Sequence, residues 1–132
     1  MLTYKNHNVN PKNRKTGDCS TRALVGCLGI KYDDALRLQF EEALKCYYDM
    51  TSRQVIEKVL AKFGYVKMKQ PRKADNTKYE VREMDRVLSA AARAQGVIVN
   101  VANHYVAIKD SEYIDIWDSG SKCVGNYYVK VR

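Results

Sequence analysis

The sequence predicts an α+β domain, because helical and strand patterns fall mainly in separate halves of the chain. Apolar residues recur at helical spacing in the first half, whereas short runs rich in Val, Ile and Tyr, separated by turn residues, mark the second half. A hydrophobic share of 45% and a charged share of 29% are typical of a globular chain. Because 132 residues suffice for one modest core, we expect a single domain over residues 1–132.

The strongest strand signal lies in the second half, where three apolar runs predict an antiparallel meander. β-Branched and aromatic residues dominate the runs, and turn-forming residues separate them. The predicted strands are Val97–Val101, His104–Lys109 and Tyr113–Trp117.

The lengths of the two connections predict which residues face each other. A two-residue first turn places Val101 opposite His104. A three-residue second loop, Asp110–Glu112, places His104 opposite Asp118. One face of the meander then collects Val and Ile side chains and carries His104 and Asp118 at its end. Asp115 is a rival carboxylate, but this register puts it on the opposite face.

Four helices and two further strands complete the expected fold. The chain before residue 17 is polar and predicts an extended or coiled lead-in, and a polar loop is expected at Gln70–Lys78. The first predicted helix starts at Cys19 after an Asp18 cap and ends before Gly29, and the second covers Tyr32–Tyr47. The third runs from a capping box at Thr51 and Gln54 to Phe63, and the fourth spans Val81–Ala94. The further strands are Tyr65–Lys69 and Asn126–Val131.

The second of these helices has an apolar stripe that predicts its buried face. Acidic residues in its first turn and a lysine in its last turn suit the helix dipole. The stripe comprises Tyr32, Leu36, Phe40, Ala43, Leu44 and Tyr47.

The net charge of +8, from 23 basic and 15 acidic residues, permits binding to an anionic surface. No long basic run is present, so a solvated basic surface is the favoured interpretation and nucleic acid is a less favoured partner. No apolar run approaches the roughly 20 residues of a membrane span. We therefore expect no membrane partner.

The start of the chain lacks the apolar core of a signal peptide, so a cytoplasmic location is expected. The cysteines are then expected to be reduced. Their spacing contains no Cys-x-x-Cys pair, so we expect neither a zinc site nor another cofactor. The four cysteines are Cys19, Cys27, Cys46 and Cys123.

Cys19 has the placement of an activated thiol, because the positive end of a helix dipole lowers the pKa of a cysteine in the first turn. Asp18 opposes this effect and Arg22 supports it. A thiolate beside an imidazole is a strong nucleophile, and a third group fixes the imidazole tautomer. The sequence offers Cys19, His104 and Asp118 for these three roles. Each residue alone has an ordinary structural explanation, but together they favour a thiol-hydrolase site.

The segment HYVAIKDSEYIDIWDSG resembles the segment of papain-like cysteine peptidases in which a His opens one strand and an Asn or Asp ends the next. The segment GDCSTRAL is similar to the nucleophile segments of smaller bacterial relatives, namely NlpC-type cell-wall peptidases and bacteriocin-processing peptidases. The chain also looks like a type of small phage-encoded protein, which would place it in the host cytoplasm. The resemblance implies a helical half carrying the nucleophile and an antiparallel sheet half carrying His and Asp.

The resemblance also implies an oxyanion-binding amide six residues before the nucleophile. That position is Asn13, one methylene shorter than the family's Gln, and Asn10 is a competing candidate. The chain departs from papain at Thr16, where papain has a second cysteine, and at Ser20, where it has an aromatic residue.

These observations predict a cysteine peptidase, or a related thiol amidohydrolase or acyltransferase, that acts on a peptide or protein substrate. The alternative is a basic nucleic-acid- or protein-binding module on a catalytically inactive scaffold of the same type. The net charge and the basic residues of Lys67–Lys73 motivate this alternative. A third and weaker hypothesis is a host-interaction protein that uses the fold as a surface.

Overall fold

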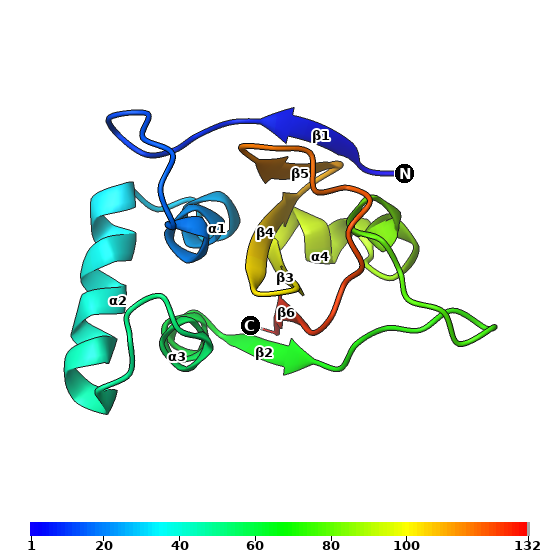
Figure 1. The fold of residues 1–132 in the computed structure, drawn as a ribbon. Coiled ribbons are helices and arrows are strands. Elements are labelled where there is room, and N and C mark those ends of the chain that lie inside the picture. Colours follow the sequence, from blue (N-terminus) through cyan, green and yellow to red (C-terminus); the bar gives the residue numbers. More distant parts are fainter. Residues whose placement is uncertain (132) are drawn as a thin grey trace.

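Six strands form one mixed sheet in the order β1-β5-β4-β3-β6-β2, and five helices accompany it (Figure 1). The computed structural model describes residues 1–131. In chain order, the elements are β1 (Thr3–Asn6), α1 (Cys19–Leu28), α2 (Tyr32–Cys46), α3 (Arg53–Lys62), β2 (Tyr65–Met68), the 3-10 helix η1 (Val81–Arg86), α4 (Ala90–Gln95), β3 (Val97–Val101), β4 (His104–Lys109), β5 (Glu112–Asp115) and β6 (Tyr127–Lys130). The predicted α+β class is confirmed, and none of the helices in the described range is long and apolar enough to cross a membrane.

The sheet is antiparallel except at one edge, where β1 pairs in parallel with β5. Strand β1 lies in the segment for which the sequence predicts an extended or coiled lead-in. Its pairing partner is more than 100 residues away, so no local pattern signals it. The first turn of the meander has two residues with positive φ, Ala102 and Asn103, and the predicted pairing of Val101 with His104 is confirmed.

The second turn differs from the prediction and shifts the register of β5 by one residue. The turn has two residues, Asp110 and Ser111, and Lys109 pairs with Glu112. Asp110 adopts a φ of 54°, its N–H donates to the carbonyl of Arg93 at 3.0 Å, and its own carbonyl accepts from the Arg93 side chain. Contacts with the end of α4 therefore favour the tighter turn. A one-residue shift changes every pairing along the strand, so the predicted opposition of His104 and Asp118 is wrong.

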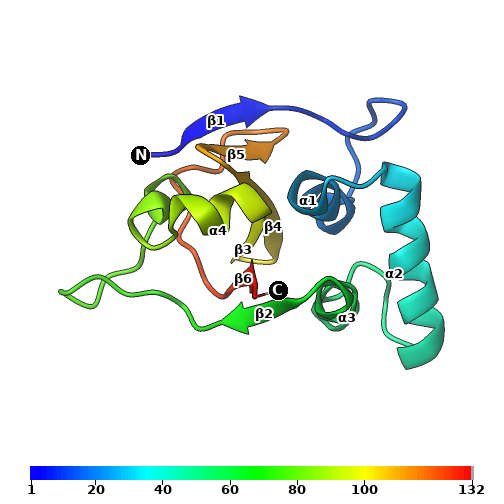
Figure 2. The same cartoon turned by 180° about the vertical axis from the view of Figure 1, so that it is seen from behind.

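Two apolar clusters cover the two faces of the sheet. Helices α1 and α3 lie on one face, and α4 lies on the opposite side, in front of β3 and β4 in Figure 2. On the first face, Gly26 of α1 lets the helix approach β4, because an added Cβ would lie 2.9 Å from the Cβ of Ala107. The first cluster includes Leu24, Val55, Ile56, Val59, Leu60, Ile98, Tyr105 and Tyr128, and the second includes Leu2, Val81, Met84, Val97, Val99, Val106 and Ile108.

Helix α2 buries a different face from the one that the sequence predicts. It packs on α1 and α3 at the outer side of the molecule (Figure 1) through Ala35, Gln39 and Glu42. Gln39 is fully buried because its amide bonds to the Thr21 and Ser20 hydroxyls, at 2.7 and 3.0 Å, and to a backbone carbonyl. Three members of the predicted stripe are exposed instead, namely Phe40 (55%), Leu44 (58%) and Tyr47 (90%).

The predicted helix over Val81–Ala94 is divided into η1 and α4. Ser89 interrupts it, because its side chain accepts the N–H of Ala92 at 3.1 Å and starts a new helix. The cap of α3 is also displaced by one residue from the prediction, since Ser52, and not Thr51, accepts a helix N–H.

Candidate active site

Helix α1 begins at Cys19 and ends before Gly29, whose φ is 68°, as the sequence predicts. The predicted cap is wrong, because the Asp18 side chain accepts no helix N–H. Its carboxylate instead accepts from Arg22 Nε at 2.8 Å and from the Tyr32 hydroxyl at 2.8 Å. These bonds and the charge of Arg22 outweigh burial and lower the pKa of Asp18. The first turn of α1 therefore carries a compensated carboxylate next to its thiol.

The Cys19 thiol lies near enough to His104 and Tyr105 for both residues to affect its pKa. Burial alone would raise the pKa of this half-buried thiol. Hydrogen bonding with the His104 ring and with the Tyr105 N–H, together with the positive charges of His104 and Arg22, outweighs burial and lowers the pKa below the usual 9.0. The structure thus brings together the two residues that the sequence assigns as nucleophile and base.

The imidazole of His104 is held by a buried carboxylate, which belongs to Asp115. The distance from His104 Nε2 to Asp115 Oδ2 is 2.7 Å, and the Asp115 side chain is 1% exposed. Burial would lower the pKa of His104, but hydrogen bonds to Asp115 and Cys19 and their negative charges raise it to about 9. Because Asp115 occupies Nε2, Nδ1 is the ring nitrogen left for the thiol.

Asp118, the predicted orienting residue, does not contact His104. Its Oδ1 accepts from the Tyr113 hydroxyl at 2.6 Å and from the Gly120 N–H at 2.9 Å, so it organises the turn after β5. The cause is the one-residue register shift, which moves Asp118 beyond the strand end. The sequence contained a signal for the tighter turn, since Asp110 is a residue type that tolerates positive φ.

Asp115 receives further hydrogen bonds that fix both of its carboxylate oxygens. Oδ1 accepts from Arg22 Nη1 at 3.1 Å and from the Ile116 N–H at 2.8 Å, while Oδ2 accepts from Ser119 Oγ at 3.0 Å. These donors and the His104 interaction outweigh burial and lower the pKa of Asp115. The carboxylate is therefore ionised and oriented toward the imidazole.

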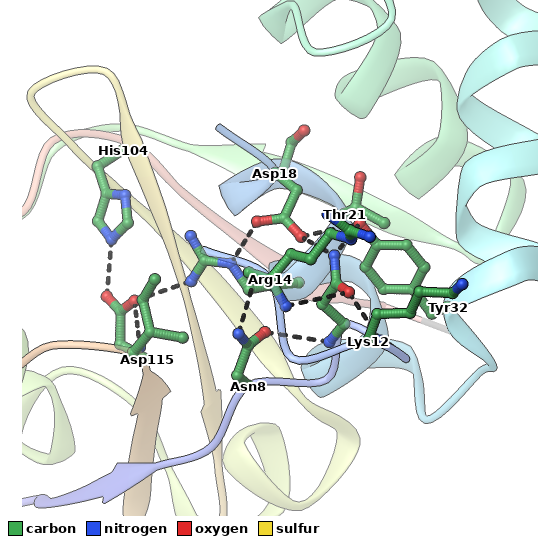
Figure 3. A network of polar contacts seen from close by, with 12 residues as sticks. Asn8, Lys12, Arg14, Asp18, Thr21, Tyr32, His104 and Asp115 are labelled. Atoms are coloured by element: carbon green, nitrogen blue, oxygen red, sulfur yellow. Dashed lines mark hydrogen bonds and ion pairs between the residues drawn. The ribbon is translucent and has the colours of Figure 1, made fainter. Parts of the chain in front are cut away.

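A polar network extends from the imidazole into the loop before α1 (Figure 3). Arg22 joins Asp115 to Asp18, and Asn10 Nδ2 donates to Asp18 Oδ2 at 3.3 Å. The other end of the Asn10 amide, Oδ1, accepts the backbone N–H groups of Lys12 and Arg14, which closes the loop. Asn10 thus supports the network around Asp18 rather than a reacting atom.

Asn13, the predicted oxyanion residue, is exposed, with a φ of 53°. Its backbone N–H donates to the Asn10 carbonyl at 2.9 Å, and within residues 1–131 its side chain makes no hydrogen bond. No hydrogen bond joins it to Cys19 or His104 within residues 1–131, so these contacts give no support to the expected role. The N–H groups at the start of α1 remain available as donors.

Trp117 packs on the imidazole, with the ring centroids of Trp117 and His104 4.9 Å apart and an interplanar angle of 31°. The indole is 41% exposed, so it covers one face of the imidazole from the solvent side. The second histidine of the chain, His7, is exposed in the polar lead-in, and its backbone N–H donates to the Asp115 carbonyl at 3.0 Å.

A cavity of about 450 Å³ opens at the turn between β3 and β4, next to the strand that carries His104. Asn103 and Tyr105, the residues before and after His104, both line it. Its other lining residues come from the start of α3, from β3 and from the segment before β6: Thr51, Ser52, Arg53, Gln54, Asn100, Gly125 and Asn126. The sequence gives no periodic signal for this cavity, because its walls come from four separate segments.

Comparisons with protein-family models, curated proteins and solved structures found no match to this chain. The chemistry of the site therefore rests on its own residues. They form a low-pKa thiol, a high-pKa imidazole and a buried carboxylate in one connected arrangement.

Proposed function

We propose that the protein is a thiol-dependent hydrolase, most simply a cysteine peptidase with a Cys19–His104–Asp115 triad. One observation carries the proposal, namely that the same imidazole lowers the pKa of a thiol and lies 2.7 Å from a buried carboxylate. These are the three roles that nucleophilic acyl transfer requires. The helical half carrying the thiol and the sheet half carrying His and Asp also support the papain-like arrangement as part of this proposal.

In the proposed reaction, the Cys19 thiolate attacks the carbonyl carbon of an amide. The developing oxyanion is stabilised by backbone N–H groups at the start of α1. The His104 imidazolium donates its proton to the leaving amine as the C–N bond breaks, which leaves an acyl-enzyme thioester. Neutral His104 then takes a proton from water, the resulting hydroxide attacks the thioester, and the acid product leaves as the thiolate re-forms. Asp115 holds the ring and stabilises the imidazolium in both half-reactions.

The alternative of a basic binding module has less support from the contacts. Two lysines of the segment that motivates it are paired, Lys67 with Glu57 at 3.1 Å and Lys73 with Glu83 at 2.8 Å. Part of the positive charge of that segment is therefore neutralised within the fold. We do not retain this function as a second proposal.

The test measures alkylation of Cys19 by neutral iodoacetamide across pH, read by peptide mass mapping. The exposed thiol of Cys123 in the same molecule is the internal reference. At pH 6 we expect Cys19 to react at least about tenfold faster than Cys123, because a lowered pKa gives Cys19 a larger thiolate fraction than an ordinary thiol has. His104→Ala should remove most of this difference.

Hydrolysis is tested in parallel with a quenched-fluorescence peptide library on the wild-type protein and on Cys19→Ala. We expect turnover by the wild type alone. Cys19 reacting at the rate of Cys123, with no effect of His104→Ala, would contradict the proposal.

A further inference from the structure

The cavity beside His104 has the position of a substrate subsite. Tyr105 forms part of the cavity wall, and its backbone N–H is one of the groups that lower the pKa of the Cys19 thiol. Cys19 and Tyr105 also belong to the same side of the sheet, since Cys19 packs against the cluster that contains Tyr105. A chain bound with its carbonyl at the thiol therefore has a neighbouring side chain within reach of the cavity.

The walls of the cavity are polar. Side-chain amides come from Gln54 and three asparagines, and hydroxyls come from Thr51, Ser52 and Tyr105. An apolar occupant would remove water from these groups without replacing its hydrogen bonds, which costs free energy for each group left unpaired. A side chain that accepts hydrogen bonds would satisfy them.

Arg53 is the one charged residue among those that line the cavity. Within residues 1–131 it forms no ion pair, and the acidic residue one turn further along α3 is occupied. That residue, Glu57, pairs with Lys67 at 3.1 Å and accepts the Tyr128 hydroxyl at 2.7 Å. The guanidinium of Arg53 is therefore free to bind a carboxylate, for which its planar donor geometry is well suited.

We infer that this cavity binds an acidic side chain of the substrate adjacent to the scissile bond, with Arg53 as the residue that selects it. The inference rests on the proposed function, because it gives the substrate class for that thiol. The net charge of +8 acts in the same direction by attracting acidic chains to the surface. The preferred substrate is then a peptide or protein with Glu or Asp near the cleaved amide.

The experiment uses tripeptidyl acyloxymethyl ketones, which alkylate an activated thiol as the carboxylate leaving group departs. Glu, Gln, Leu or Lys is placed at each of the two positions before the ketone, and intact mass gives the second-order rate of labelling. In the wild type, we expect the Glu probe to react at least about fivefold faster than the Lys probe at one of the two positions, as a charge-assisted hydrogen bond warrants. Arg53→Glu should abolish or invert that ratio.

The ratio of Glu to Lys rates within each variant cancels any change in the reactivity of the thiol itself. Arg37→Glu is the matched control, because this substitution makes the same change in total charge and Arg37 lies on α2, away from the cavity. It should keep the wild-type ratio. Rapid alkylation of Cys19 by iodoacetamide with equal Glu and Lys rates would overturn the inference alone. Slow alkylation by iodoacetamide as well as by every ketone would overturn the proposed function and this inference with it.

Discussion

The guanidinium of Arg22 in α1 lies 3.1 Å from the Asp115 carboxylate in β5, and so connects the helix that carries the thiol to the carboxylate that holds the imidazole. The same guanidinium bonds to Asp18, one residue before the thiol, at 2.8 Å. The Arg22 side chain is 9% exposed. Two carboxylates and one guanidinium therefore share a site from which water is largely excluded.

Loss of Arg22 should destabilise the fold strongly. Arg22→Met would leave the Asp18 and Asp115 carboxylates buried without their shared partner, and we expect a loss of about 3–5 kcal/mol in the free energy of unfolding. Urea denaturation measures the loss. Arg37→Met removes an exposed pair with Asp34 and should cost less than about 1 kcal/mol.

If Arg22→Met does not fold, the triple variant with Asp18→Asn and Asp115→Asn provides the second measurement. It lacks the unpaired charges and should recover part of the lost stability. An Arg22→Met protein as stable as Arg37→Met would show that the network contributes little.

The two aspartates near His104 can be distinguished by a matched pair of substitutions. Asp115→Asn removes the charge that stabilises the imidazolium. We therefore expect the rate of hydrolysis to fall by at least about 100-fold and the rate of Cys19 alkylation at low pH to fall by about tenfold. Asp118→Asn keeps an acceptor for Tyr113 and Gly120 and should change both rates by less than about threefold. The opposite order of effects would restore Asp118 as the orienting residue.

The titration of His104 reports directly on its two partners. Proton NMR should give a pKa of about 9 in the wild type, against an ordinary value of 6.5. In Cys19→Ser only the Asp115 carboxylate remains as a charged partner, so the pKa should lie between these values. Asp115→Asn should lower it further. A wild-type value at or below 6.5 would contradict the described contacts.

The raised pKa of His104 also predicts how its contribution to stability depends on pH. The folded state binds the proton more tightly than the unfolded state, so the stabilisation is complete below about pH 6.5 and is lost as pH rises through about 9. The difference in unfolding free energy between wild type and His104→Ala should therefore decrease over this range. A constant difference, measured by urea denaturation from pH 6 to 10, would show that protonation of His104 is not coupled to folding.

Neighbouring residues on α2 should differ in their effect on stability. Gln39→Ala removes three hydrogen bonds and leaves the buried Ser20 and Thr21 hydroxyls without a partner, for an expected cost of about 2–4 kcal/mol. Phe40→Ser changes an exposed side chain and should alter stability by less than about 0.5 kcal/mol. Thermal denaturation of the two variants checks the order. A larger cost for Phe40→Ser would mean that the apolar stripe of this helix is covered in the folded protein.

Much of the local structure could be predicted from the sequence because its causes are local. Gly29 ends α1 through its left-handed backbone, and the two-residue turn after Val101 sets the pairing with His104. The assignment of Cys19 to the first turn of a helix also followed from residue type and position. These features depend on backbone preferences and on contacts between residues that are close along the chain.

The tertiary structure decided the remaining features, because they depend on contacts between distant segments. Bonds between Asp110 and Arg93 select the tighter turn, and the resulting shift of one residue places Asp115 rather than Asp118 on the imidazole. Packing of α2 on α1 buries an amide and leaves Phe40 in solvent, since hydrogen-bond partners for Gln39 lie on that side. The sequence by itself determined which residue types could react. The tertiary structure decided which carboxylate holds the imidazole, because the register of the strands is set by the energy of the whole packed sheet.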